Sequence, residues 1–332
     1  MRAYVLTRYG GPDAMQIRDV PEPQPEPGEV RIKVVAEGLN PVDYKIRQGG
    51  LRVITRLRLP AVAGCELAGT VDAVGPGVSG FAVGDPVYAR VDKARLGAFA
   101  EFVCLQQDLV APMPVSLGFA EAAGLPLAGL TALQALRDEL GVGHGTRLFI
   151  SGGAGGVGTL AIQLAKYLGA EVTTTASSRG EALVRSLGAD RVIDYTKQDF
   201  AGFLHGFDAG LDLVGGEALE GIFRILKPGG KVVSIAGAPE PLTARKDLKR
   251  PLLAPLFWVI SWSLRRRAHR LGVSYRYLFM HPSGEDLRFL ARLVDDGQLR
   301  PVVDSTYPFD RIGEAFAVLE EGRAKGKIVV TL

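Results

Sequence analysis

The apolar positions along the chain follow two different patterns, and the change between them falls near residue 120. Before it, short β-rich runs alternate with glycines, prolines and other turn-forming residues, a pattern typical of a β domain. The strands expected here are Met1–Thr7, Val30–Glu37, Gly69–Val74, Pro86–Arg90 and Phe99–Leu105. This half therefore predicts a small, barrel-like β domain.

After Ala120 the pattern changes to a helical stretch, Ala120–Leu140, followed by short apolar runs that alternate with helical segments. The expected strands are Leu148–Ser151, Glu171–Ala176, Arg191–Asp194, Gly210–Val214, Lys231–Ala236 and Val273–Met280, and the expected helices are Thr159–Leu168, Gly180–Leu187 and Ala218–Leu226. This alternation predicts a parallel, doubly wound α/β sheet. Beyond it, an amphipathic helix is expected at Gly284–Asp295 and a closing strand at Ile328–Leu332.

The segment Arg147–Lys166 predicts a strand, a glycine turn and a helix in direct succession. Its glycines match the dinucleotide-binding fingerprint, which allows a tight turn, close approach of a pyrophosphate and close packing of helix on strand. The helix N-terminus would present free N–H groups and its positive dipole end to the phosphates. The residues expected to contact the cofactor are Gly153, Ala154, Gly155, Gly156, Val157 and Gly158. The alternative is a glycine loop that serves only as a turn.

The end of the next strand indicates which dinucleotide binds. An NAD site usually has Asp or Glu about 20 residues further on, which holds the ribose 2′-hydroxyl. Here the strand Glu171–Ala176 is followed by Ser177, Ser178 and Arg179, and no carboxylate stands at its end. Hydroxyls and a guanidinium suit a 2′-phosphate. We therefore expect NADPH, the alternative being that Arg179 only begins the following helix in solvent.

Length and composition are typical of a soluble, globular protein with room for two domains: 332 residues, 47% hydrophobic and 23% charged. The first residues enter a strand directly, so we expect no signal peptide. Cys65 and Cys104 are too few for a disulfide framework, which favours a cytoplasmic location. Eight basic residues and one acidic residue lie between Ala244 and Arg270, so the net charge of +3 comes from this segment and does not support a nucleic-acid surface.

Several further motifs occur in a fixed order along the whole chain. They are Gly38–Gly49 (GLNPVDYKIRQG), Ala63–Val71 (AGCELAGTV), Phe81–Val87 (FAVGDPV), Ala98–Val103 (AFAEFV), Gly124–Ala132 (GLPLAGLTA), the glycine turn, Leu187–Tyr195 (LGADRVIDY), Leu226–Lys231 (LKPGGK) and Gly322–Val330 (GRAKGKIVV). On these residues the chain resembles the medium-chain dehydrogenase/reductase superfamily, and within it the zinc-independent quinone oxidoreductase group that includes zeta-crystallin. The resemblance implies a bilobal fold. A chaperonin-10-like substrate domain would comprise residues 1–119 and 281–332, with a Rossmann NADPH-binding domain, 120–280, inserted between them.

The resemblance also bears on a metal site. Zinc-dependent relatives have a cysteine where this chain has Asn40, a histidine where it has Cys65, and four cysteines in a loop where Val91–Leu105 holds only Cys104. Zinc takes about four ligands, of which a catalytic site draws three from the protein. We therefore expect no zinc, and interpret Cys65 as a small apolar core residue. A site rebuilt from Cys65, Glu66 and a distant histidine is the alternative.

Without a metal Lewis acid, the expected reaction is hydride transfer from C4 of NADPH to an acceptor that is already electrophilic, a quinone or another α,β-unsaturated carbonyl. The resemblance implies that Asn40 binds the nicotinamide or the substrate carbonyl, and that Tyr44 or Lys45 polarises the substrate oxygen. Many relatives carry tyrosine where Lys45 stands. Asp43 is expected to brace the loop, because an unperturbed carboxyl is ionised at neutral pH.

Four further positions are expected to lie near the cofactor. They are Thr131, Tyr195, Ala236 and Gly237. For Tyr195 the alternative is an aromatic side chain packed against a helix. The alternatives for the whole chain are a reductase of alkenals or enoyl thioesters, and a low-turnover NADPH-binding protein of the crystallin kind.

The segment Pro251–Leu264 departs from the compact relatives. It is too short to span a bilayer, which takes about 20 residues, but Trp258 and Trp262 fall one helical turn apart and arginines follow. Weak contact of residues 251–270 with a membrane surface is one interpretation; a helix pair at a domain edge or dimer interface is the other. The resemblance implies a homodimer, because in such relatives the final Rossmann strand pairs with its mate across a two-fold axis, and Val273–Met280 is expected to be that edge strand.

Overall fold

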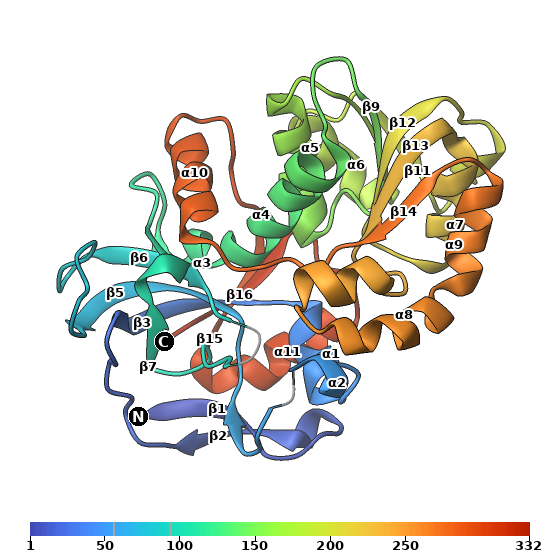
Figure 1. The fold of residues 1–332 in the computed structure, drawn as a ribbon. Helices are drawn as coiled ribbons and strands as arrows, with labels where there is room; N and C mark the ends of the chain where they lie inside the picture. The colour runs from blue at the N-terminus through green and yellow to red at the C-terminus, as the bar shows by residue number, and fades with distance from the viewer. Residues whose placement is uncertain (56, 93–94) are drawn as a thin grey trace. The chain divides into compact units, whose positions relative to one another are not determined.

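The fold was analysed in a computed structural model that describes residues 1–55, 57–92 and 95–332 (Figure 1). The chain forms two compact units. Unit 1 combines both ends of the chain, Met1–Leu130 and Pro282–Leu332, and unit 2 is the continuous stretch Thr131–His281. The chain therefore leaves unit 1 once and returns to it.

Unit 1 is built on a seven-stranded sheet in the order β15-β16-β3-β5-β6-β8, with β7 also paired to β3, and a three-stranded sheet, β2-β1-β4. The strands are β1 (Arg2–Leu6), β2 (Met15–Asp19), β3 (Glu29–Leu39), β4 (Ala61–Val62), β5 (Glu66–Val74), β6 (Pro86–Arg90), β7 (Phe102–Gln106), β8 (Val110–Pro112), β15 (Val303–Pro308) and β16 (Lys327–Thr331). The helices are α1 (Pro41–Arg47), α2 (Arg52–Thr55), α3 (Phe119–Ala123), α4 (Pro126–Leu133, whose last residues belong to unit 2), α10 (Gly284–Asp295) and α11 (Ile312–Glu320). The expected barrel-like β domain is confirmed, and β2, β4, β8 and β15 are additions to it.

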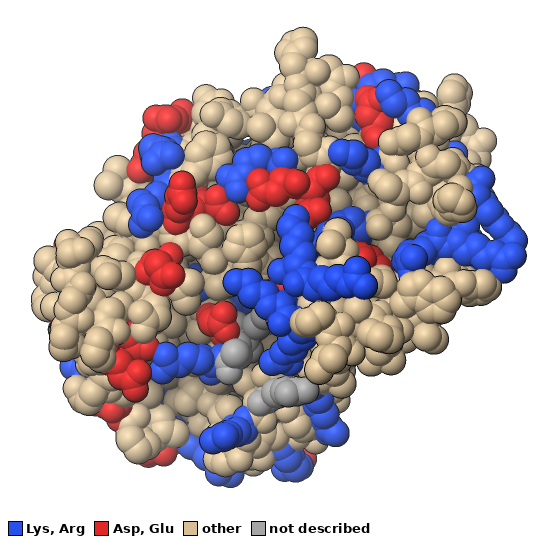
Figure 2. Space-filling model, viewed as in Figure 1, with Lys and Arg blue, Asp and Glu red and all other residues tan. Residues whose placement is uncertain are grey.

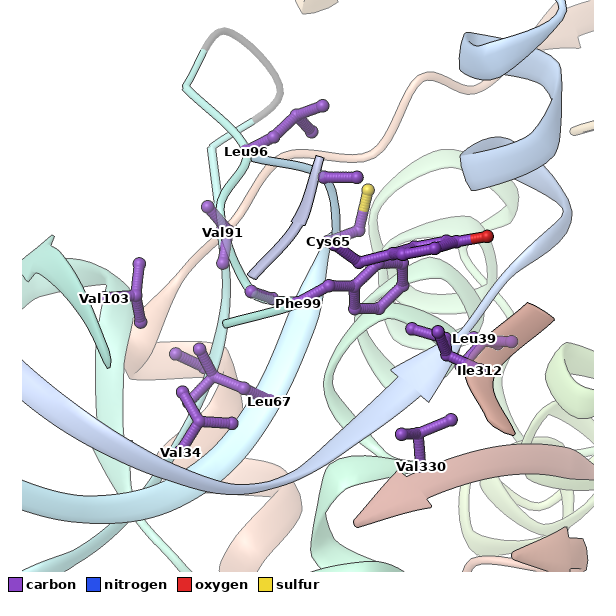
Figure 3. Close-up of a cluster of buried hydrophobic side chains, with 14 of the residues drawn as sticks. Val34, Leu39, Cys65, Leu67, Val91, Leu96, Phe99, Val103, Ile312 and Val330 are labelled. Carbon is purple, nitrogen blue, oxygen red and sulfur yellow. The ribbon is translucent and has the colours of Figure 1, made fainter. Parts of the chain in front are cut away.

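The core of unit 1 needs both ends of the chain. β16 pairs antiparallel with β3, with Ile328 opposite Leu39. The close-up of the buried cluster shows Phe99 and Cys65 from the N-terminal part together with Ile312 and Val330 from the C-terminal part (Figure 3). This packing explains why the N-terminal strands alone do not make a complete domain.

Unit 2 contains a six-stranded parallel sheet in the order β11-β10-β9-β12-β13-β14. The strands are β9 (Arg147–Ile150), β10 (Glu171–Ala176), β11 (Arg191–Asp194), β12 (Phe207–Asp212), β13 (Leu226–Ser234) and β14 (Ser274–Tyr277). The helices are α5 (Gly156–Tyr167), α6 (Ser178–Ser186), α7 (Gly216–Ile225), α8 (Ala254–Ile260) and α9 (Trp262–Arg270). Figure 1 shows α5 on one side of this sheet and α7 with α9 on the other. The expected parallel, doubly wound sheet is confirmed.

Several expected elements have other bounds than those observed; the strands expected at Gly210–Val214 and Lys231–Ala236 are Phe207–Asp212 and Leu226–Ser234. The helical stretch Ala120–Leu140 is interrupted after α3, continues as α4 and ends in a π-helix, Gln134–Leu140. The strand expected at Val273–Met280 is only Ser274–Tyr277 long, at the edge of its sheet. Strand order reverses between β9 and β12, and open α/β sheets bind ligands at the carboxyl ends of their strands beside such a point.

Candidate active site

The glycine turn of unit 2 leaves no room for side chains at two of the three fingerprint positions. A Cβ on Gly153 would lie 2.2 Å from Thr174 Oγ1, and one on Gly158 would lie 2.3 Å from the carbonyl oxygen of Gly152. Gly155 is different, because the atom nearest to its Cβ would be 3.5 Å away. Its place just before α5 leaves room for a ligand at the N-terminus of that helix. The turn therefore has the close packing that a dinucleotide site needs.

A buried network that we did not predict ties the carboxyl ends of three neighbouring strands together. Asp212, at the end of β12, accepts hydrogen bonds from the hydroxyls of Ser151 (3.0 Å) and Ser234 (2.6 Å). Ser151 Oγ accepts in turn from the Leu213 N–H (3.0 Å), and Ser234 Oγ from the Gly237 N–H (2.8 Å). The sequence signal that could have predicted this network is the small polar residue at the end of each of the three strands. The network fixes the glycine turn and the loop of Ala236 and Gly237 to the same edge of the sheet.

The end of β10 carries the residues expected to choose between NADPH and NADH. Ser177 precedes α6, while Ser178 and Arg179 are exposed in its first turn. No carboxylate stands at the end of β10, but the Ser178 hydroxyl donates to Asp194, at the end of the neighbouring strand β11. Hydrogen bonds from Ser178 and Thr196 hold the pKa of Asp194 well below its usual range. A carboxylate therefore lies beside this site, and the sequence interpretation missed it.

Two of the other expected cofactor positions differ in exposure. Tyr195 is 60% exposed. Thr131 is buried at the beginning of unit 2. Contact of either residue with a cofactor stays a prediction.

In unit 1, Asp43 holds the start of α1 in place. Its Oδ2 accepts a hydrogen bond from the Asn40 N–H at 2.8 Å, as a bracing role requires. The stated reason for that role was wrong, however, because the carboxyl is not unperturbed. Burial raises the pKa of Asp43 to about 6, against the opposing effects of the Cys65 thiol, the Asn40 N–H, Arg90 and Lys327. Asp43 can therefore take up a proton just below neutral pH.

Asn40 belongs to a second buried cluster, which contains an ammonium group. The Nζ atom of Lys327 lies 2.5 Å from Asn40 Oδ1 and 2.6 Å from Glu66 Oε1. The Asn40 amide nitrogen donates to the same Glu66 oxygen at 2.7 Å, and Glu66 Oε2 accepts from the Leu127 N–H at 2.6 Å. Both ends of the Asn40 amide thus have partners within the protein. Its expected contact with the nicotinamide or the substrate carbonyl stays a prediction.

The resemblance places one metal ligand of zinc-dependent relatives at Asn40, which belongs to this cluster, and another at Cys65, next to Glu66. The Lys327 ammonium is bound to Glu66 Oε1, and Glu66 is one of the ligands that the rebuilt zinc site would use. Cys65 is fully buried in the apolar core, and burial raises the pKa of its thiol well above the ordinary value. In the described residues, no group of three or more His, Cys, Asp or Glu side chains is placed to hold a metal. The donor set does not fit the rebuilt site.

Tyr44 and Lys45 lie next to each other on α1 but in different environments. Tyr44 is half-buried, and its pKa is raised by burial and then by the Glu320 carboxylate. Lys45 is exposed. A phenol with a raised pKa keeps its proton at neutral pH, as a proton donor must. Neither residue's role in catalysis is tested by this geometry.

Two family profiles match the chain, one on each side of the glycine turn. Residues 26–115 match the alcohol dehydrogenase GroES-like domain, and residues 187–330 match the family described as zinc-binding dehydrogenase. Among curated proteins, the chain is similar to an NADPH-dependent alkenal/one oxidoreductase, chloroplastic, of Arabidopsis thaliana, with 37% identity covering 99% of this chain and 79% of that protein. It is also similar to the chloroplast envelope quinone oxidoreductase homolog of the same plant, with 33% identity covering 99% and 98%.

Solved structures also match the chain over its whole length. The quinone oxidoreductase of Coxiella burnetii matches with a TM-score of 0.87 and 32% identity over 100% of this chain and 99% of that one. A mycobacterial protein solved with NADPH matches at 0.83 and 30%, covering both chains completely. The fold and the glycine turn define a nucleotide-binding oxidoreductase of the GroES-like and Rossmann type. The chain belongs to the medium-chain dehydrogenase/reductase superfamily, in its quinone oxidoreductase-like group.

Proposed function

We propose that this chain is an NADPH-dependent oxidoreductase that reduces a quinone or another α,β-unsaturated carbonyl without zinc. The observation that carries the metal-free part is the Lys327 ammonium between Asn40 and Glu66, 2.5 and 2.6 Å from their oxygens. The substrate class is supported by relatives named alkenal/one oxidoreductase and quinone oxidoreductase, and the cofactor by the one named NADPH-dependent. The turn fits a dinucleotide because it is tightly packed at Gly153 and Gly158, where neighbouring atoms leave no room for a Cβ.

NADPH, when bound, supplies a hydride; one proton completes the two-electron reduction. The glycine turn and the α5 N-terminus bind the pyrophosphate, and Ser177, Ser178 and Arg179 receive the 2′-phosphate. Tyr44 or Lys45 stabilises the charge that develops on the substrate oxygen and gives it a proton. Asn40 binds the nicotinamide or the substrate carbonyl, and Asp43 braces the loop. Thr131, Tyr195, Ala236 and Gly237 complete the cofactor contacts.

We further propose that residues 120–280 serve as the cofactor domain, and residues 1–119 and 281–332 as the substrate domain. A homodimer through the edge strand β14 is supported by the position of that strand, because an edge strand offers unpaired backbone groups to a second copy.

A reducing compartment such as the cytoplasm is supported by two free, buried cysteines, whereas some relatives are named chloroplastic or mitochondrial. No helix in the described residues is long and apolar enough to cross a membrane.

The relative named alkenal/one oxidoreductase favours a second candidate within the same chemistry, a reductase of alkenals or enoyl thioesters. The test measures NADPH and NADH oxidation with 1,4-benzoquinone, a naphthoquinone, a short 2-alkenal and an enoyl thioester after dialysis against a chelator. Turnover with NADPH that survives chelation is expected, and the preferred acceptor ranks the candidates. Cofactor binding without reduction of any acceptor would instead support the low-turnover NADPH-binding alternative.

A further inference from the structure

Unit 2 has a surface on which six large apolar side chains are exposed together. Leu252 is 93% exposed, and each of the other five is at least 46% exposed. We call these residues the α8 face: Leu252, Leu256, Trp258, Val259, Ile260 and Trp262. Contiguous apolar surface of this kind usually marks a place where a protein meets a partner or a membrane. Neither the glycine turn nor the proposed chemistry uses it.

The α8 face points outward because the opposite sides of its helices are fixed to the protein. Ala254 and Phe257 of α8 are buried, and the buried hydroxyl of Ser261 donates to the Phe257 carbonyl at 2.6 Å. On α9, Leu264 and Ala268 pack into the core cluster that includes Phe223. Positions 252, 256, 259 and 260 recur at helical spacing on the other side. Turning α8 to bury its apolar face would therefore expose its present core residues.

Within the chain segment that carries the α8 face every charged side chain is basic, and one of them, Arg267, is ion-paired with Glu220 of α7. No Asp or Glu occurs in the sequence between Asp247 and Glu285. Lys249, Arg266 and Arg270 are exposed, and the Arg266 guanidinium lies over the Trp262 ring, 5.0 Å from its centre. Figure 2 shows the Lys and Arg side chains gathered over α9, beside an uncharged surface over α8. The surface thus combines exposed tryptophans with a basic border, as helices that lie in a membrane interface do.

We propose that the α8 face binds the surface of an anionic lipid membrane. The apolar side chains and the two tryptophans enter the interface between headgroups and acyl chains, and Lys249, Arg266 and Arg270 contact lipid phosphates. A second copy of the chain fits less well. A two-fold interface brings the same patch of both copies together, and the charged side chains of this patch are basic, so the patch offers no acidic group to pair with them. This inference does not depend on the proposed reaction, since lipid binding is measured without substrate.

The test is flotation of the purified full chain with vesicles of phosphatidylcholine, alone or mixed with phosphatidylglycerol, at low and high salt. Binding to the mixed vesicles is expected, with strong weakening in high salt and little binding to phosphatidylcholine alone. Trp258→Ser with Trp262→Ser should lower the partition coefficient at least tenfold. Arg266→Gln with Arg270→Gln should lower it about fivefold per cation removed. The matched controls are Val115→Ser and Arg323→Gln, exposed residues of unit 1, which should bind as the wild type does.

The charge-removal variant alters only exposed side chains, so it tests the proposal even if the tryptophan variant fails to fold. Absence of binding to the mixed vesicles, or equal binding by the Arg266/Arg270 variant, would overturn the proposal. Sedimentation velocity without lipid tests whether a second copy of the chain occupies the α8 face instead. If substitutions in the α8 face convert a dimer to a monomer and leave vesicle binding unchanged, the face is a contact between two copies. Turnover of NADPH is recorded for every variant, so failure of the proposed reaction stays separate from failure of lipid binding.

Discussion

Lys327 and Glu66 are separated by 261 residues in the sequence, yet Lys327 Nζ lies 2.6 Å from Glu66 Oε1. Their side chains are 4% and 0% exposed. Desolvating two charges costs several kcal/mol, so such a pair persists only where hydrogen bonds satisfy the remaining polar atoms. Asn40, the Leu39 carbonyl and the Leu127 N–H supply those bonds. The pair thus joins β16, β5 and the Asn40 loop at one point of unit 1.

Lys327→Met should destabilise unit 1 by about 3–5 kcal/mol, because it leaves the Glu66 carboxylate buried without its counter-charge. Hydrogen exchange of the β3 and β16 amides measures this loss. Both tryptophans lie in unit 2, so tryptophan fluorescence provides an internal control that should change little. Adding Glu66→Gln should recover part of the loss. Unchanged exchange in Lys327→Met would show that the pair contributes nothing to stability.

Asp43→Asn should remove a pH dependence of stability that the wild type has. The carboxyl ionises near 3.8 when unfolded but near 6 when folded, so the folded protein binds more protons between these values. Its stabilising contribution is therefore complete below about pH 4 and is lost as the pH rises through 6. Between these two pH ranges the contribution of Asp43 to the free energy of unfolding falls by about 3 kcal/mol.

Urea unfolding at a series of pH values, compared between wild type and Asp43→Asn, isolates this carboxyl. Glu37 is also buried with a raised pKa, but it is present in both proteins, so its contribution to the pH dependence largely cancels in the comparison. The variant should gain stability relative to the wild type between pH 4 and 6. Parallel stability curves would contradict the raised pKa.

Two glycines of the turn should respond differently to alanine. At Gly158 the added Cβ would lie 2.3 Å from the Gly152 carbonyl, so Gly158→Ala should lower both stability and NADPH affinity. At Gly155 the nearest atom is 3.5 Å away, so stability should change by less than about 1 kcal/mol. If the pyrophosphate approaches there, Gly155→Ala should still weaken NADPH binding about tenfold or more. Calorimetric titration of both variants distinguishes packing from ligand contact.

Arg179→Ala should reduce the preference for NADPH over NADH about tenfold or more, because the charge that pairs with the 2′-phosphate is removed. The ratio of kcat/KM for the two cofactors measures it. Arg185→Ala, on the same helix and ion-paired with Glu181, is the matched control. An unchanged ratio would mean that Arg179 only begins α6.

Tyr44→Phe should lower kcat about tenfold or more if its hydroxyl gives the proton, since positioned acids contribute roughly 10²–10⁴ in rate. Lys45→Met is the companion variant, because Lys45 is exposed and adjacent. Steady-state turnover with one quinone and one enone compares the two. Wild-type rates in both variants would remove both residues from the mechanism.

The parts that were predictable from the sequence are those determined by local periodicity. Pro86–Arg90, Arg191–Asp194 and Gly284–Asp295 form elements with the predicted bounds, because their apolar patterns are unambiguous. β2 was missed because its residues, MQIRD, are mostly exposed and polar. α1 is short and begins with a proline, so its apolar pattern gives little helical signal.

The missed parts of the candidate site depend on pairings between distant segments. Asp194 reaches Ser178 only because β11 lies beside β10, and strand order cannot be read from periodicity. Lys327 reaches Asn40 only because β16 pairs with β3. The raised pKa of Asp43 comes from burial by the surrounding fold, whereas the sequence shows only an aspartate one turn into a helix.

The pairing of β16 with β3 also governs the order in which the protein can be made. Lys327 and Leu39, which meet there, are 288 residues apart. On a ribosome adding about 5–20 residues per second, unit 2 can complete its sheet while unit 1 still lacks β15, β16 and α11. For roughly 15–60 s, the time needed to add those 288 residues, the apolar side of β3 has no C-terminal partner. Translation speed and chaperone supply therefore act on the first part of this chain more than on its middle.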